Sequence, residues 1–384
     1  MRCDVMAMEP DPRATLLANL RGKTLHIPPL RPLFTPAWQT SLEAINPLHE
    51  QLKTFMGEKL ATLIEDKRVL EGMKKGDAGL WVSGLFPTAN FQTLSLFATY
   101  TIFLFLWDDA IDGSDSSLTP TLENAEKYCA NSVGFIRYCL LGSSGSVDES
   151  EPVAPTKVCQ LFGEVAAGLK AGYLNDGGKN EFVELNVLYE HLKQYVDACL
   201  VEYRWRTRIE SDEMMPTIKE FWGWRLGTSS VNVMLDFERV LNGVVLSSGL
   251  REDAELGEQI KGMEGDVNRG FVVINELFSL KKELKDGALG NLIPITMHEL
   301  GLDLDGATKK VVQELGECLR DFDEKAGVLQ MRADKNSDEM VQMARKLVEG
   351  YRAIITGTLN FSIHSPRYGV LKDQKEDASF EIEL

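Results

Sequence analysis

The fold is constrained most by the spacing of the apolar residues, which recur three and four positions apart through most of the chain from about residue 40. This spacing puts them on one face of a helix, because an α-helix turns once in about 3.6 residues. No sustained run alternates with the period of two that marks a half-buried strand. The pattern therefore predicts an all-α protein. The helical segments are 42–70, 91–112, 122–141, 158–171, 182–208, 217–241, 256–285, 306–330 and 337–363.

Short polar breaks separate most of these segments. They are rich in Gly, Pro, Ser and Asp, and none resembles a linker between domains. The chain of 384 residues is longer than an average domain, but large helical folds reach this length as one unit. We therefore expect residues 1–384 to form a single helical bundle. It would carry a Pro- and Arg-rich extended arm at 1–40, a surface loop at 142–156 and a C-terminal tail at 371–384.

Charge and cysteine content narrow the class of protein. The 41 basic and 58 acidic residues give a net charge of −17, which repels polyanions, so nucleic acid is not expected as a partner. An anionic small substrate would then need a metal ion or a few placed Arg and Lys side chains. The six cysteines are scattered and no signal peptide is recognisable at the N-terminus. These features favour a cytoplasmic protein with reduced thiols.

One uncharged stretch, 91–107 (FQTLSLFATYTIFLFLW), is about as long as the shortest membrane-spanning helix. It contains several Thr, Ser and Gln residues, and it ends on Asp108 and Asp109 without a basic flank. We therefore expect a buried core helix and no stable membrane insertion.

The end of this helix carries carboxylates. Asp108 and Asp112 lie one turn apart, and Phe97 and Phe105 lie further back along the same stripe. Such a pair of carboxylates can share hard cations such as Mg²⁺ while these hold phosphate oxygens. A solvated acidic helix end or an N-cap of the next segment explains the pair equally well. Asp109 points off this face and would orient a ligand or pair with a basic residue.

A second polar set interrupts the apolar segment FVVINELFSLKKEL at 271–284. Asn275, Ser279 and Glu283 are each four residues apart, so an amide, a hydroxyl and a carboxylate share one helix face, which Phe271 continues. Together they can chelate one hard cation. The alternative is that Asn and Ser simply face solvent.

Candidate cationic groups come from two further places. Arg367 and Tyr368 follow Pro366 at the end of a helical segment, where they could bind phosphate, although this dipeptide is also common on surfaces. Arg225 stands in EFWGWRLGTSSV, where the Gly, Ser and Thr residues of 227–230 weaken a helix and let it bend. A tight helix crossing explains the small residues at least as well.

Three motifs in this order resemble the class I terpene synthases, and the chain length and flanking residues look most like the fungal sesquiterpene cyclases. DDAID at 108–112 is similar to the aspartate-rich motif of the family, NELFSLKKE at 275–283 to its second metal motif, and RY at 367–368 to the pair near its end. The resemblance covers residues 40–370. It implies a helical bundle around a central active-site cavity, as a monomer or homodimer.

For such an enzyme the resemblance implies that the site binds three Mg²⁺ ions and the diphosphate of farnesyl diphosphate. The implied metal ligands are Asp108, Asp112, Asn275, Ser279 and Glu283. The implied diphosphate-binding residues are Arg225, Lys282, Arg367 and Tyr368, of which Arg225, Arg367 and Tyr368, with Asp108, are also the catalytic candidates. Cavity candidates are Phe97, Phe105 and Phe271, with Phe86, Phe221 and Trp222 as further possibilities.

The chain departs from the family pattern at some positions. Glu276 stands where Asp is common, and we expect little effect because it points off the ligand face; Phe361 stands where Trp is frequent. The match around Arg225 is loose, so the roles of 228–230 stay open. A chain-elongating prenyltransferase or a non-catalytic prenyl-diphosphate binder remains the alternative, against which Asn, Ser and Glu in the second motif argue.

Overall fold

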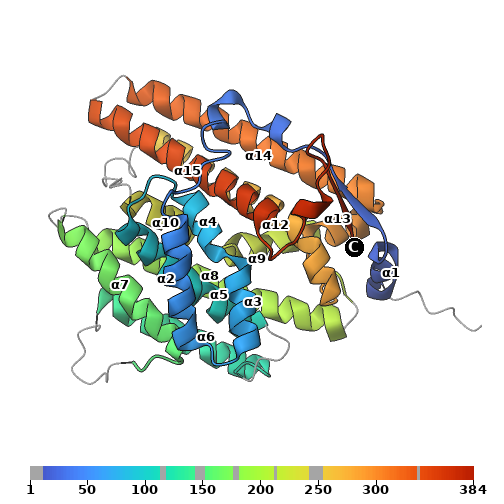
Figure 1. Cartoon of the computed structure of the whole chain (residues 1–384), viewed down its shortest axis with the longest axis horizontal. Coiled ribbons are helices and arrows are strands. Elements are labelled where there is room, and N and C mark those ends of the chain that lie inside the picture. Colours follow the sequence, from blue (N-terminus) through green and yellow to red (C-terminus); the bar gives the residue numbers. More distant parts are fainter. Residues whose placement is uncertain are drawn as a thin grey trace, which may run out of the picture.

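The computed structural model describes residues 12–112, 118–142, 152–175, 181–211, 214–241, 254–334 and 338–384. In these parts the chain is almost entirely helical, as predicted (Figure 1). The helices are α1 (Pro12–Leu20), α2 (His49–Leu63), α3 (Lys67–Gly76), α4 (Ala78–Leu85), α5 (Phe91–Asp112), α6 (Leu122–Leu141), α7 (Lys157–Asn175), α8 (Glu181–Ser211), α9 (Ile218–Thr228), α10 (Val231–Leu241), α12 (Ala254–Lys285), α13 (Leu292–Leu300), α14 (Leu304–Ala333) and α15 (Asp338–His364).

The long apolar helix α5 lies inside the bundle, where it packs against α2, α4, α7 and α8. Phe97, Phe103 and Trp107 are among the most deeply buried side chains of the protein. In the part of the chain that the structure describes, α5 is the one helix that is long and apolar enough to cross a membrane, and 61% of its most apolar stretch is buried. Burial in the core accounts for its composition.

The long helices α12, α14 and α15 pack against one another, and Figure 1 shows α14 and α15 running along one side of the molecule. Helix α4 joins this group to the remaining helices, because it packs closely against α15. Gly84 and Gly357 meet at this crossing, where a Cβ on Gly357 would lie 2.5 Å from the Gly84 carbonyl carbon. The absence of both side chains lets the two backbones touch.

Two of the segments predicted as single helices, 42–70 and 217–241, are each divided into two helices. The predicted 42–70 contains α2, which ends at Leu63, and the start of α3, which Asp66 caps by accepting from the N–H groups of Arg68 and Val69. Asp77 takes a left-handed conformation at the corner to α4, with φ of 49°. The helices α1, α4 and α13 were not predicted, since each has nine residues or fewer; α1 lies within the arm at 1–40 that was expected to be extended, so that expectation was wrong for Pro12–Leu20.

The N-terminal arm and the C-terminal tail meet in a two-stranded antiparallel sheet. Strand β1 (Thr24–Ile27) pairs with β2 (Phe380–Glu383), with Leu25 opposite Ile382 and Ile27 opposite Phe380, all four buried. Strands of four residues leave almost no periodic signal, so the sequence predicted only an extended arm and a tail. Most of the predicted loop 142–156 lies outside the described residues.

Candidate active site

The polar face of α12 is the centre of the candidate site. Asn275, Ser279 and Glu283 share this face, as their spacing predicted, and Asn275 and Glu283 are half-buried. Ser279 is only 4% exposed, and its Oγ has no hydrogen-bond partner among the described residues. A buried hydroxyl without a partner is rare, because it loses its bonds to water on folding. With the amide of Asn275 and the carboxylate of Glu283 on the same face, the hydroxyl of Ser279 completes a set of oxygens that suits a hard cation.

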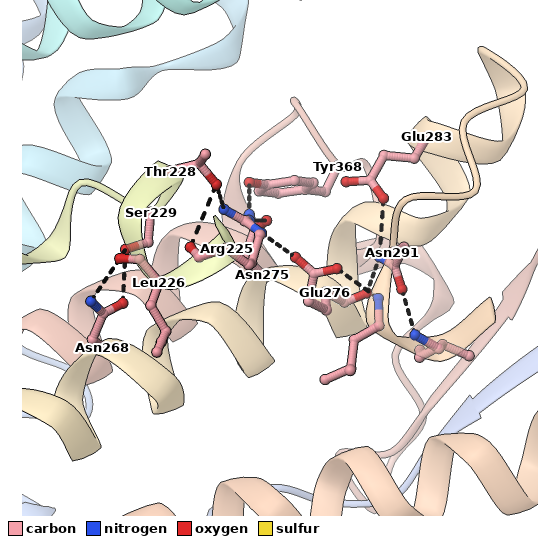
Figure 2. A network of polar contacts seen from close by, with 12 residues as sticks. Arg225, Leu226, Thr228, Ser229, Asn268, Asn275, Glu276, Glu283, Asn291 and Tyr368 are labelled. Atoms are coloured by element: carbon pink, nitrogen blue, oxygen red, sulfur yellow. Dashed lines mark hydrogen bonds and ion pairs between the residues drawn. The ribbon is translucent and has the colours of Figure 1, made fainter. Parts of the chain in front are cut away.

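Arg225 on α9 reaches this face of α12 (Figure 2). Its Nη2 donates to Asn275 Oδ1 at 2.8 Å, its Nε to Glu276 Oε1 at 2.9 Å, and its Nη1 to Thr228 Oγ1 at 3.3 Å. Burial disfavours its charge, but the carboxylates of Glu276, Glu202 and Glu283 together outweigh this effect and raise the pKa of Arg225. The guanidinium is therefore fixed and charged beside the proposed ligand Asn275.

Glu276 points away from the ligand face, as expected, but its surroundings differ from what the sequence suggested. Its side chain is 2% exposed; Oε1 accepts from Arg225, and Oε2 accepts from the backbone N–H of Leu292 at 2.9 Å. Burial raises the pKa of Glu276, and the charge of Arg225 opposes that rise. The residue thus ties α9 and α13 to α12.

Tyr368 completes the contacts around Asn275. Asn275 Nδ2 donates to the Tyr368 hydroxyl at 3.0 Å, so the amide lies between Tyr368 and Arg225 (Figure 2). Burial raises the pKa of Tyr368, opposed by the charge of Arg367. The phenol therefore stays protonated and can donate a hydrogen bond. The structure brings together three residues that lie far apart in the sequence.

The helix breaks shortly after Arg225, as its small residues suggested. Helix α9 ends at Thr228 and α10 begins at Val231, with Ser230 in a left-handed conformation at φ of 57°. The Ser229 hydroxyl donates to Asn268 Oδ1 at 2.8 Å, and Asn268 Nδ2 donates to the Leu226 carbonyl at 2.9 Å (Figure 2). The Ser229 hydroxyl and the Leu226 carbonyl near the break are thus both bound by Asn268 on α12.

The aspartates at the end of α5 have different surroundings. Asp108 is half-buried and accepts a hydrogen bond from the hydroxyl of Tyr195 on α8 at 3.0 Å. Asp109 lines a pocket with Arg367; partial desolvation raises its pKa, against the opposing charges of Arg367 and Lys282. The side chain of Asp112 lies outside the described residues. The aspartate that was expected to point off the face of Asp108 and Asp112 is therefore the one that lines the pocket.

The pocket has a volume of about 440 Å³, and the exposed, charged side chains of Arg367 and Asp109 are part of its lining. Its walls come from α2, α3, α5 and the end of α15, and they include Phe105, Phe361 and Asp109. The guanidinium of Arg367 lies 5.4 Å from the centre of the Phe105 ring, a cation–π distance. An apolar pocket with charged side chains in its lining suits an amphiphilic ligand.

Trp81 on α4 is the residue that sequence reasoning missed. Its ring stacks on Phe105 at 5.6 Å and lies 6.2 Å from both Phe271 and Phe361. Of the predicted cavity residues, only Phe105 is part of the pocket lining; Phe271 is buried beside Trp81, and Phe97 is fully buried in the core. A tryptophan in the short apolar run AGLWVSGL was the available signal.

Lys282 is exposed at the C-terminal end of α12, near enough to influence the charge of Asp109. The described residues contain no group of three or more His, Cys, Asp or Glu side chains that could hold a metal ion. The set on α12 is of another kind, because only one of its three candidate ligands is acidic. A metal there would depend on neutral oxygens as well as on Glu283.

Residues 99–321, more than half of the chain, match the family model described as "Terpene synthase family 2, C-terminal metal binding". The chain belongs to this family. The terpene synthase is 24% identical over 379 residues to the "Sesquiterpene cyclase hepA" of Aspergillus oryzae, covering 97% of this chain and 96% of that one. It is 21% identical over 364 residues to the "Terpene cyclase braA" of Annulohypoxylon truncatum, covering 93% and 89%.

Solved structures support the fold of this terpene synthase. The crystal structure of germacradien-4-ol synthase from Streptomyces citricolor superposes with a TM-score of 0.66 at 15% identity, covering 84% of this chain and 95% of that one. The protein therefore has the all-α class I terpenoid synthase fold that its motifs predicted.

Proposed function

We propose that the protein is a sesquiterpene synthase, which ionises farnesyl diphosphate in the presence of Mg²⁺, cyclises the resulting cation and releases pyrophosphate. The observation that carries this proposal is the link that Tyr368 makes between the polar face of α12 and an aromatic pocket: it bonds to Asn275, and its ring lies 5.9 Å from that of Phe361, which lines the pocket. The preceding residue, Arg367, is also part of the pocket lining. The sesquiterpene cyclase name of the Aspergillus relative supports the choice of substrate.

The proposed metal ligands are Asn275, Ser279 and Glu283 on α12, together with Asp108 and Asp112 on α5. The buried, unbonded Oγ of Ser279 supports this assignment, because a metal ion would satisfy it. Three Mg²⁺ ions would neutralise the diphosphate and stabilise the charge that develops as its C–O bond breaks. We therefore propose a role for these residues in binding and orienting the diphosphate.

The proposed role of Arg225, Arg367 and Tyr368 is to donate hydrogen bonds to the departing diphosphate. Arg225 is held on two sides, by Asn275 and Glu276, so little conformational freedom remains to be lost when it binds an anion. Lys282 would add charge at the exposed edge. Fixed donors of this kind stabilise a leaving group more than mobile ones.

The proposed role of the aromatic residues is to enclose the hydrocarbon chain and its cation. Trp81 packs against Phe105, Phe271 and Phe361, so Trp81 and Phe271 support from behind the aromatic wall that Phe105 and Phe361 give to the pocket. Ring faces stabilise a desolvated cation by about 1–2 kcal/mol each. An apolar wall also excludes water, which would otherwise quench the cation early.

Incubation of the purified protein with farnesyl diphosphate and Mg²⁺ tests the proposal. We expect pyrophosphate release and a cyclic sesquiterpene hydrocarbon or alcohol in the organic extract, identified by gas chromatography and mass spectrometry. Geranyl and geranylgeranyl diphosphate serve as chain-length controls. Longer prenyl diphosphates in the aqueous phase would point to chain elongation, and no turnover of any of the three substrates would refute the proposal.

A further inference from the structure

Asn291 is a completely buried residue at the N-terminus of α13. Its Oδ1 accepts from the backbone N–H of Ile293 at 2.9 Å, which caps the helix. Its amide nitrogen donates to Glu283 Oε2 at 3.0 Å and to the backbone carbonyl of Glu276 at 2.9 Å. Figure 2 shows the amide between these two residues of α12. The side chain thus uses its acceptor and both of its donors.

Capping alone does not require these donors. Ser, Thr and Asp cap helices about as well as Asn, because a cap needs one acceptor oxygen. Among these residues, only Asn combines a capping oxygen with an NH₂ group that can bond two further acceptors. The identity of the residue therefore suits a second task, the holding of Glu283.

Glu283 is a side chain whose orientation a hydrogen bond can fix. It lies in the last turn of α12 and is half-buried, and a glutamate side chain has several rotamers of similar energy. The bond from Asn291 fixes one carboxylate oxygen, while the carboxylate keeps lone pairs for further partners. Residues that orient a metal ligand in this way typically change metal affinity by about 10–100-fold when replaced.

The start of α13 also contacts Glu276, the partner of Arg225. The backbone N–H of Leu292 donates to Glu276, and Glu276 in turn accepts from Arg225. Two adjacent residues, Asn291 and Leu292, therefore connect the proposed ligand Glu283 with the buried guanidinium of Arg225. This continuity makes the start of α13 a common support for both groups.

We propose that Asn291 is a positioning residue that holds the Glu283 carboxylate ready to bind a divalent cation. The inference rests on the proposed function, because it takes Glu283 as a metal ligand. Asn291 itself touches neither metal nor substrate in this proposal. Its replacement acts through Glu283 and weakens cation binding before it affects any later step.

Two variants separate positioning from capping. Asn291→Asp keeps the length and the capping oxygen but removes both donors, and Asn291→Ser keeps a good cap on a shorter, neutral side chain. Asp303→Ala is the matched control. Asp303 caps α14 by accepting from Gly306 N at 2.8 Å, and its replacement removes this cap but leaves the hydrogen bonds of Asn291 and Glu276 unchanged. Far-UV circular dichroism and thermal unfolding compare the folding of all three.

The measurement is a titration of the full-length protein with Mn²⁺ in the presence of inorganic pyrophosphate. Bound ion is read from the loss of the electron paramagnetic resonance signal of free Mn²⁺, corrected for the protein-free mixture. We expect the apparent Kd to rise at least about 10-fold in Asn291→Asp and Asn291→Ser, and to stay unchanged in Asp303→Ala. Unchanged affinity in both folded Asn291 variants overturns the proposal.

A double-mutant cycle distinguishes action through Glu283 from a general structural effect. In a Glu283→Ala background, Asn291→Ser should weaken Mn²⁺ binding no further. An equal additional loss in that background overturns the positioning role. If the unsubstituted protein binds Mn²⁺ and pyrophosphate but forms no terpene, the proposed function fails while this inference stands.

Discussion

The hydroxyl of Ser279 is buried without a hydrogen-bond partner in the described structure, a condition that costs about 1–3 kcal/mol. Asn275 and Glu283, its neighbours on the same helix face, have partners that orient them, Arg225 and Tyr368 for one and Asn291 for the other. Of the three proposed ligands on α12, two are thus held by hydrogen bonds, and the third, Ser279, has an oxygen that a cation would satisfy.

Removal of a ligand from this face should stop the reaction without unfolding the protein. We expect Asn275→Ala and Glu283→Ala each to lower the rate of pyrophosphate release by about 100-fold or more, the scale of losing one preorganised electrostatic group. Helical circular dichroism should remain unchanged. Glu317→Ala, an exposed glutamate on α14, is the control. Near-normal turnover in both site variants would refute the assignment of this helix face to metal.

Loss of the Glu276 carboxylate should act mainly on stability. Glu276→Ala leaves the buried guanidinium of Arg225 without its charged partner, which typically costs about 3–5 kcal/mol. Chemical denaturation should therefore show a reduced free energy of unfolding. Glu317→Ala serves as the surface control, with a change within about 0.5 kcal/mol. An equally small effect of Glu276→Ala would mean that the ion pair with Arg225 contributes little.

At the scale of helices, the contact between α4 and α15 positions the aromatic wall. Gly357 and Gly84 touch backbone to backbone, and Trp81 lies three residues before Gly84 on the same helix. The indole nitrogen of Trp81 donates to Thr358 Oγ1 at 3.3 Å, so its ring orientation also depends on this crossing. The shape of the pocket is therefore coupled to the distance between two helices.

A methyl group at this crossing should move the helices apart. In Gly357→Ala the new Cβ would lie 2.5 Å from backbone carbon of Gly84, and we expect a loss of about 1–3 kcal/mol of stability. Gly327→Ala on α14, where a Cβ meets nothing within 4 Å, is the matched control and should be neutral or slightly stabilising. Thermal unfolding compares the two; equal melting temperatures would contradict the tight crossing.

The helices that carry the motifs could be predicted because their evidence is local. Spacing of four puts Asn275, Ser279 and Glu283 on one face whatever the rest of the fold does. Contacts between helices have no such signature: the bonds from Glu276 to Arg225 and Leu292 depend on how α9 and α13 pack against α12. The same reason explains why Trp81 was missed and why Asp109, rather than Asp108, was found in the pocket wall.

At the scale of the whole molecule, a buried charged cluster joins α8, α10, α12 and α15. Arg239 contacts Asp236, Glu264 and the hydroxyl of Tyr351, and His191 Nδ1 lies 2.6 Å from Asp236 Oδ2. Burial disfavours the imidazolium, but the Asp236 carboxylate outweighs it and raises the pKa of His191. The charged form of this histidine is therefore favoured by folding.

Stability should consequently depend on pH. A raised pKa means that the contribution of His191 is complete below the unfolded-state value of 6.5 and is lost as pH rises through the higher folded-state value. We expect the melting temperature to fall over this window in the unsubstituted protein. In His191→Gln the fall should be smaller, as measured by thermal unfolding at closely spaced pH values. An identical pH profile for both proteins would exclude this contribution.

The pairing of β1 with β2 imposes an order on the folding of the protein. Gly22 N donates to the carbonyl of Leu384, and Leu384 N donates to the carbonyl of Lys23, so the arm is bound by a segment that is synthesised after all the described helices. Until then the arm has no strand to pair with, although helices nearer the N-terminus can already pack. The N-terminal arm is therefore anchored only after the helices that carry the candidate site have been synthesised.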